Sequence, residues 1–67
     1  MTIYEKINRW ISQHENHKYP DRSLDSIADY IDWAWKWKKI SKEEMESAAD
    51  RICRLFDEEL EDLRNYR

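Results

Sequence analysis

The chain has 67 residues, which is the size of one small domain. A chain of this length buries only about 60% of its unfolded surface, which excludes a multidomain enzyme with a deep cleft. Charged and hydrophobic residues each make up 40% of the chain, a balance that favours a folded domain over a disordered segment. Glycine is absent and proline occurs once, so glycine-rich phosphate loops are excluded.

The sequence also bears on the compartment. The single cysteine, Cys53, cannot form an internal disulfide, which favours a reducing, intracellular setting. No apolar run approaches the roughly 18 residues of a membrane span, and the first ten residues lack a signal-peptide pattern. We therefore expect a cytoplasmic protein without a membrane partner.

The first predicted helix begins at the N-terminus, where Thr2 and Glu5 have the spacing of a capping box. The helix is expected to end within residues 15–18, and residues 19–22 form a connector because Pro20 disfavours a helical residue before it. One apolar stripe follows the helical repeat; it consists of Ile3, Ile7, Trp10, Ile11 and His14.

The second predicted helix begins at Ser23, or earlier if Asp21 is the cap, and ends near Lys38. Its apolar residues form two stripes about 120° apart around the helix. The larger stripe is expected to lie in the core and comprises Leu24, Ile27, Ala28, Ile31, Ala34 and Trp35. The smaller stripe is expected to bind a partner protein and comprises Tyr30, Trp33 and Trp37.

The third predicted helix begins at Ser41, which forms a capping box with Glu44, while Ile40 and Met45 form a hydrophobic staple. Two or three residues separate it from the second helix, so the two are expected to be antiparallel or steeply crossed neighbours. Its apolar stripe contains Met45, Ala48, Ala49, Ile52, Phe56, Leu60 and Leu63, with Cys53, Leu55 and Tyr66 on the flanks.

The third helix, at about 24 residues, is predicted to overhang the other two by about two turns. An apolar stripe that continues along an otherwise charged overhang is typical of an interface. The residues expected to form a homodimer interface are Phe56, Leu60, Leu63 and Tyr66. The predicted fold is an all-α, three-helix domain over residues 1–67, assembled as a dimer.

The net charge of -3 is unevenly distributed, because residues 43–62 alone carry a net charge of -7. Such a segment can be a solvated face that keeps the protein soluble. It can also dock on a basic, nucleic-acid-binding surface of another protein, since carboxylates can occupy sites built for phosphates. Small acidic inhibitors from phages and mobile elements act in this way. The partner-binding carboxylates are then Asp57, Glu58, Glu61 and Asp62.

An alternative function is a DNA-associated transcriptional or nucleoid regulator that acts as a helical dimer. The lysines of residues 36–42 would contact the DNA backbone in this hypothesis. Three acidic residues in the first turns of the third helix, Glu43, Glu44 and Glu46, would repel phosphates. The sequence therefore favours a protein partner over direct nucleic-acid binding.

Catalytic and metal-binding chemistry has little support in the sequence. A zinc site could use His14, His17 and Cys53, but its fourth ligand would have to be a carboxylate such as Glu15. Cys53 lies in mid-helix beside the apolar stripe, so a buried or half-buried structural cysteine is expected. We predict a non-enzymatic regulator or inhibitor of a protein partner, without a metal or cofactor.

Two short stretches, residues 23–26 (SLDS) and residues 47–50 (SAAD), resemble similarly placed stretches in the small haemolysin-expression-modulating family. That family is helical, has this length and binds a nucleoid protein. The resemblance covers about eight of the 67 residues, and the tryptophan-rich stretch between them does not match the family. No residue role is transferred from it.

Overall fold

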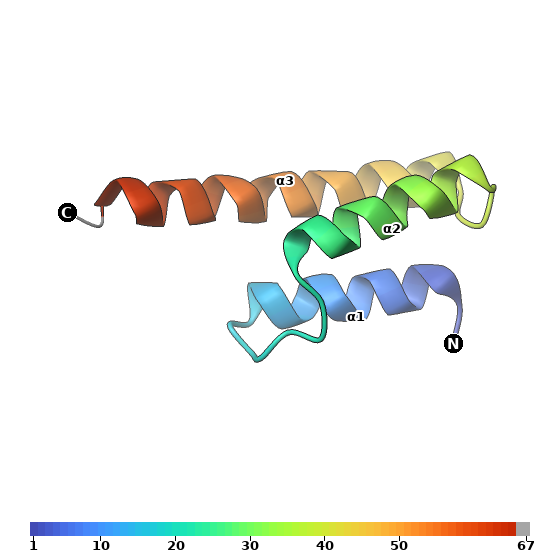
Figure 1. Cartoon of the computed structure of the whole chain (residues 1–67). Helices are drawn as coiled ribbons and strands as arrows, with labels where there is room; N and C mark the ends of the chain where they lie inside the picture. Colours follow the sequence, from blue (N-terminus) through green and yellow to red (C-terminus); the bar gives the residue numbers. More distant parts are fainter. Residues whose placement is uncertain (66–67) are drawn as a thin grey trace.

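Three helices make up the fold in the computed structural model, which describes residues 1–65 and the side chains of residues 1–61. They are α1 (Ile3–Glu15), α2 (Leu24–Lys36) and α3 (Lys42–Asn65), and the described residues contain no strand. Figure 1 shows α1 and α3 running in one direction and α2 running back between them. The predicted all-α, three-helix architecture is confirmed, with α2 and α3 antiparallel.

Each helix begins at the predicted cap. The backbone N–H of Glu5 donates to the Thr2 hydroxyl at 3.1 Å, and that of Ser26 donates to the Ser23 hydroxyl at 3.2 Å. In α3 the capping box is reciprocal, because the Glu44 N–H donates to Ser41 while the Ser41 N–H donates to the Glu44 carboxylate. These bonds satisfy N–H groups that have no partner within the helix.

The first two helices end in the same way although the chain has no glycine. His17 and Lys38 follow the caps of α1 and α2, and both have a φ of 56°. In each case the next N–H bonds back to a carbonyl five residues earlier, Lys18 to Gln13 and Lys39 to Ala34. This is the Schellman arrangement, which usually places glycine at the left-handed position. Helix α2 therefore ends at Lys36, two residues earlier than predicted.

The core lies where all three helices meet. It is built from one stripe of each helix, together with Ile40 of the connection between α2 and α3. Its buried members are Ile7, Ile11, Leu24, Ile27, Ile31, Ala34, Ile40, Ala48, Ile52 and Leu55. The stripe predicted for α1 is confirmed, since Ile7 and Ile11 are fully buried while Ile3 and Trp10 pack against the core.

Three residues lie differently from the prediction. Trp35 was assigned to the core but is 40% exposed, because the core direction of α2 passes through Ile27, Ile31 and Ala34. Cys53 was expected to be buried or half-buried and is exposed. Leu55, predicted like Cys53 to lie on the flank of the stripe, is buried in the core. Periodicity located the apolar stripes correctly but misjudged their centres.

The predicted overhang is present. Helix α3 has 24 residues and α1 and α2 have 13 each, so α3 continues alone at its C-terminal end (Figure 1). Leu60 on this segment is 54% exposed, whereas Phe56 is half-buried against the core. The other two residues of the predicted dimer interface, Leu63 and Tyr66, lie outside the described side chains, as does Asp62.

Candidate protein-interaction surface

The acidic overhang, residues 57–61 of α3, carries four exposed carboxylates beside Leu60: Asp57, Glu58, Glu59 and Glu61. Among the side chains of residues 1–61, ion pairs join Asp32 to Lys36 and Glu15 to Arg51. Arg54, four residues before Glu58, forms no ion pair with it within residues 1–61. The overhang presents a row of unneutralised carboxylates to the solvent.

The tryptophans of α2 divide between two sides of the helix. Trp33 and Trp37 are 41% and 68% exposed and lie on the side of Tyr30. Trp35 lies two residues from each, which places it about 160° round the helix from both. The predicted partner stripe, Tyr30, Trp33 and Trp37, therefore lies on one side of α2, and Trp35 lies on nearly the opposite side.

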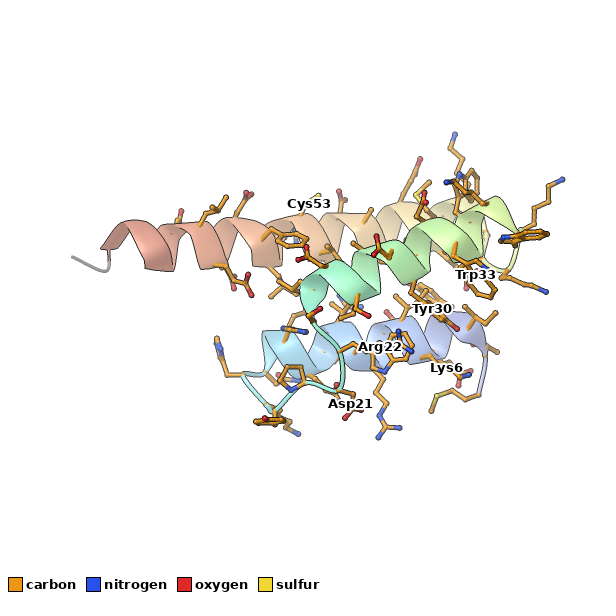
Figure 2. The ribbon with its side chains drawn as sticks, in the orientation of Figure 1. Lys6, Asp21, Arg22, Tyr30, Trp33 and Cys53 are labelled. Carbon is orange, nitrogen blue, oxygen red and sulfur yellow. The ribbon has the colours of Figure 1, made fainter. Side chains whose placement is uncertain are left out.

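Tyr30 is half-buried between α2 and α1 and belongs to an aromatic cluster. Its ring meets Trp10 edge-on, with 5.0 Å between the ring centroids, and meets Trp33 at 5.3 Å. Figure 2 shows Tyr30 and Trp33 on the side of α2 that faces α1. Much of the Tyr30 ring is thus used within the fold, and Trp33 and Trp37 are the exposed part of this stripe.

Arg22 covers this cluster and was not anticipated from the sequence. Its guanidinium lies 4.5 Å from the Trp10 ring centroid and 5.5 Å from that of Tyr30, within the range of cation–π attraction. The connector that carries Arg22 is held to α1 by two hydrogen bonds between Asp21 and Gln13. The Gln13 side-chain amide donates to the Asp21 carboxylate at 3.1 Å, and the Asp21 backbone N–H donates to Gln13 Oε1 at 3.0 Å. Because Arg22 lies in an irregular segment, no periodic signal could place it over these rings.

Arg51 joins α3 to α1 and was also missed. Its guanidinium donates to Asn8, to Ser12 at 3.3 Å, and to both oxygens of Glu15. The bond from Arg51 is the largest factor that lowers the pKa of Glu15, and the same bond raises the pKa of Arg51. The spacing of Asn8, Ser12 and Glu15, four and then three residues, was the available signal for a polar stripe along α1.

His14 is a packed, hydrogen-bonded histidine, as predicted. Its Nε2 lies 2.6 Å from the carbonyl oxygen of Arg22, and since a carbonyl only accepts, Nε2 carries the proton. Within the described residues, no three His, Cys, Asp or Glu side chains gather as metal ligands. His14 and His17 instead line a depression of about 320 Å³ beneath the overhang, together with Lys18, Leu24, Leu55, Glu58 and Glu59.

The lysines of the alternative DNA-binding hypothesis surround the turn between α2 and α3. Lys36, Lys38, Lys39 and Lys42 are all exposed, but Lys36 is paired with Asp32 at 3.0 Å. The next turn of helix is acidic, with Glu43 exposed and Glu44 used in the cap of α3. The positive charge of this lysine group is therefore confined to one short turn.

Comparison with protein-family models, with curated proteins and with solved structures finds no match for this chain. The eight-residue resemblance to the haemolysin-expression-modulating family thus brings no function to it. None of the described helices is both long enough and apolar enough to cross a bilayer.

Proposed function

We propose that this protein is a non-enzymatic interaction domain that regulates or inhibits a partner protein carrying a basic surface. The observation that carries this proposal is the acidic overhang, residues 57–61, which extends beyond the body of the fold. Charges that only keep a protein soluble can lie anywhere on its surface. Here α3 continues past the ends of α1 and α2. Glu58 and Glu59 border a depression shared with those helices, whereas Asp57 and Glu61 do not line it, so a surface of another protein can contact the segment.

The basic surface that we favour is one that binds nucleic acid. Carboxylates and phosphates are both recognised by the charge-assisted hydrogen bonds of Arg and Lys. On α3, Asp57 and Glu61 are four residues apart and share one side of the helix, while Glu58 and Glu59 project from other sides, so the segment carries negative charge around its circumference. A protein bound in this way would lose its access to DNA or RNA, which is a direct means of inhibition.

The test uses the whole chain to capture its partner from the native host, followed by affinity measurements with the purified partner. Binding is expected to weaken at least tenfold between about 50 and about 300 mM salt, because the attraction is between exposed charges. The chain is also expected to displace a fluorescent DNA or RNA duplex from that partner.

The decisive variant combines Asp57→Asn, Glu58→Gln and Glu61→Gln, and we expect it to lose at least about tenfold in affinity. The matched control combines Glu5→Gln, Glu43→Gln and Glu46→Gln, which remove the same charge from exposed positions elsewhere. Equal losses in the two variants, or an affinity indifferent to salt, would overturn the proposal.

A further inference from the structure

An apolar groove lies between α2 and α3, and the proposed function makes no use of it. Its volume is about 240 Å³, below the roughly 300–1,000 Å³ of small-molecule sites. It is lined by Ala28 and Ile31 of α2 and by Ala49, Ile52, Cys53 and Phe56 of α3. An open apolar depression of this size suits a few side chains of another polypeptide.

The groove faces away from α1. Helix α1 contacts α2 at Tyr30 and α3 at Arg51. Ala28 lies two residues before Tyr30 on α2, and Ala49 lies two residues before Arg51 on α3. Each alanine is therefore about 160° round its helix from the contact with α1. Figure 2 agrees, since Cys53 lies on the side of α3 opposite α1. No other described element of this chain covers that side of the α2–α3 pair.

The α3 wall has the spacing that a second helix requires. Ala49, Cys53, Phe56 and the exposed Leu60 are separated by four, three and four residues, the repeat of a helix–helix seam. The side chains at Ala28 and Ala49 are small, so the backbone of an incoming helix can approach closely. Trp35 lies seven residues after Ala28, on the same side of α2, and extends the apolar surface beyond the groove.

Both edges of the groove are acidic. Helical spacing places Asp25 and Asp32 beside Ala28 on α2, and Asp50 and Asp57 beside Cys53 on α3, all four exposed. Arg54 lies between Asp50 and Asp57 and leaves this edge with a net negative charge. The nearest basic side chain on α2, Lys36, is already paired with Asp32. A second copy of this chain would bring identical acidic edges against these, whereas a helix flanked by Lys and Arg would complement them.

We propose that the α2–α3 groove receives an amphipathic helix of the partner protein, with its apolar face in the groove and basic side chains along both acidic edges. This inference rests on the proposed function, because it specifies a helix as the part of the proposed partner protein that binds. It adds a second contact, on the side of α3 opposite Glu58, that supplies the apolar part of the binding.

The test uses three synthetic peptides of about three heptads. The first has Leu at both seam positions and Lys at the flanking positions. The second replaces Lys by Glu, and the third scrambles the first so that no seam remains. Cys53 is the only thiol and it lines the groove, so its alkylation by N-ethylmaleimide reports occupancy. We expect the Lys peptide alone to slow this alkylation at least about tenfold.

Two substitutions that add side chains of similar size test whether the peptide binds in the groove. Ala49→Gln fills the groove and is expected to weaken binding of the Lys peptide at least about tenfold. Ser47→Gln makes a comparable change at an exposed position about 160° round the same helix and should leave binding unchanged. Circular dichroism checks that both variants keep the helical content and unfolding midpoint of the parent.

The outcomes separate this inference from the proposed function. If the scrambled peptide binds as well as the Lys peptide, or if Ala49→Gln has no effect, the groove is not the docking site. If Glu58→Gln, on the side of α3 opposite the groove, weakens capture of the partner while Ala49→Gln does not, the proposed function stands without the groove. Sedimentation as a dimer with Cys53 already protected would show that a second copy covers the groove, which also overturns the inference.

Discussion

The two sides of the α2–α3 pair differ in what they present to the rest of the molecule. On the side of α1, large polar and aromatic side chains close the contact, with Arg51 bonded to three residues and Arg22 lying over Trp10 and Tyr30. On the side opposite α1, the small residues Ala28 of α2 and Ala49 of α3 line the space between the two helices, and a groove remains. One side is bridged by specific contacts, and the other is left open among the described residues.

This difference shows why helical periodicity alone could not tell which side of α2 the helix α1 covers. Apolar residues lie on both sides of the core stripe of α2, so the pattern predicts that both of these sides are buried against protein. The bulkier pattern, Tyr30–Trp33–Trp37, was read as the partner surface because it contains more aromatic area. In the structure Tyr30 packs against Trp10 and the smaller residues line the groove.

The largest expected effect comes from the core that both sides share. Ile27 is fully buried, and Ile27→Ala should lower the free energy of unfolding by about 2–4 kcal/mol through lost burial and a residual cavity. On the open side, Cys53→Ala should change it by less than about 0.5 kcal/mol. Urea unfolding measures both. A large cost for Cys53→Ala would mean that the open side also stabilises the monomer.

Removal of the bridge to α1 should have the next largest effect. Arg51→Met keeps the alkyl chain but loses the bonds to Asn8, Ser12 and Glu15, and should destabilise the fold by about 1–2 kcal/mol. Arg54→Met removes an exposed guanidinium from the same helix and should cost less than about 0.5 kcal/mol. Similar losses in the two variants would deny Arg51 its bridging role.

A stabilising change can separate folding from binding. Lys38 has a φ of 56°, a conformation that glycine adopts without steric cost, so Lys38→Gly should raise the free energy of unfolding by about 0.5–1 kcal/mol. The residue lies at the turn between α2 and α3, away from the groove. Binding of the Lys peptide should therefore be unchanged while the thermal midpoint rises, as calorimetry and titration can show.

The smallest expected effect depends on pH. The pKa of Glu15 is lowered from 4.5 in the folded chain, chiefly by its bond to Arg51, so the ionised form favours folding. Because Glu15 is partly exposed, we expect about 0.5 kcal/mol at neutral pH, lost as the pH falls through the lowered pKa. Glu15→Gln should be less stable than the parent near pH 7 and equal to it in acid.

The control for this titration is the same substitution in an Arg51→Met background. Without the guanidinium the carboxylate loses its bonded partner, so the effect of Glu15→Gln on urea unfolding should vary much less with pH, because only the smaller effects of burial and Arg54 remain. A pH-dependent difference that persists in this background would assign the effect to another group.

Local signals in the sequence predicted the helices well. Thr2, Ser23 and Ser41 each begin a helix, because a side-chain acceptor at a cap acts on N–H groups only two or three residues away. The length of α3 and its overhang were predictable because one apolar stripe continues at helical spacing from Met45 to Leu63. The ends of α1 and α2 were harder to place, since His17 and Lys38 occupy positions where glycine is the usual signal.

The amino-acid sequence by itself determined the three helices, their apolar stripes and the concentration of negative charge on the last one, because each of these depends on residues within a few turns of one another. Only the tertiary structure decided that α1 packs on the Tyr30–Arg51 side, that Trp35 and Cys53 stay exposed, and that Ala28 and Ala49 meet in a groove. Those outcomes depend on which side of a helix pair a third helix covers. That choice is made by contacts between residues such as Asn8 and Arg51, 43 positions apart, and no local pattern records it.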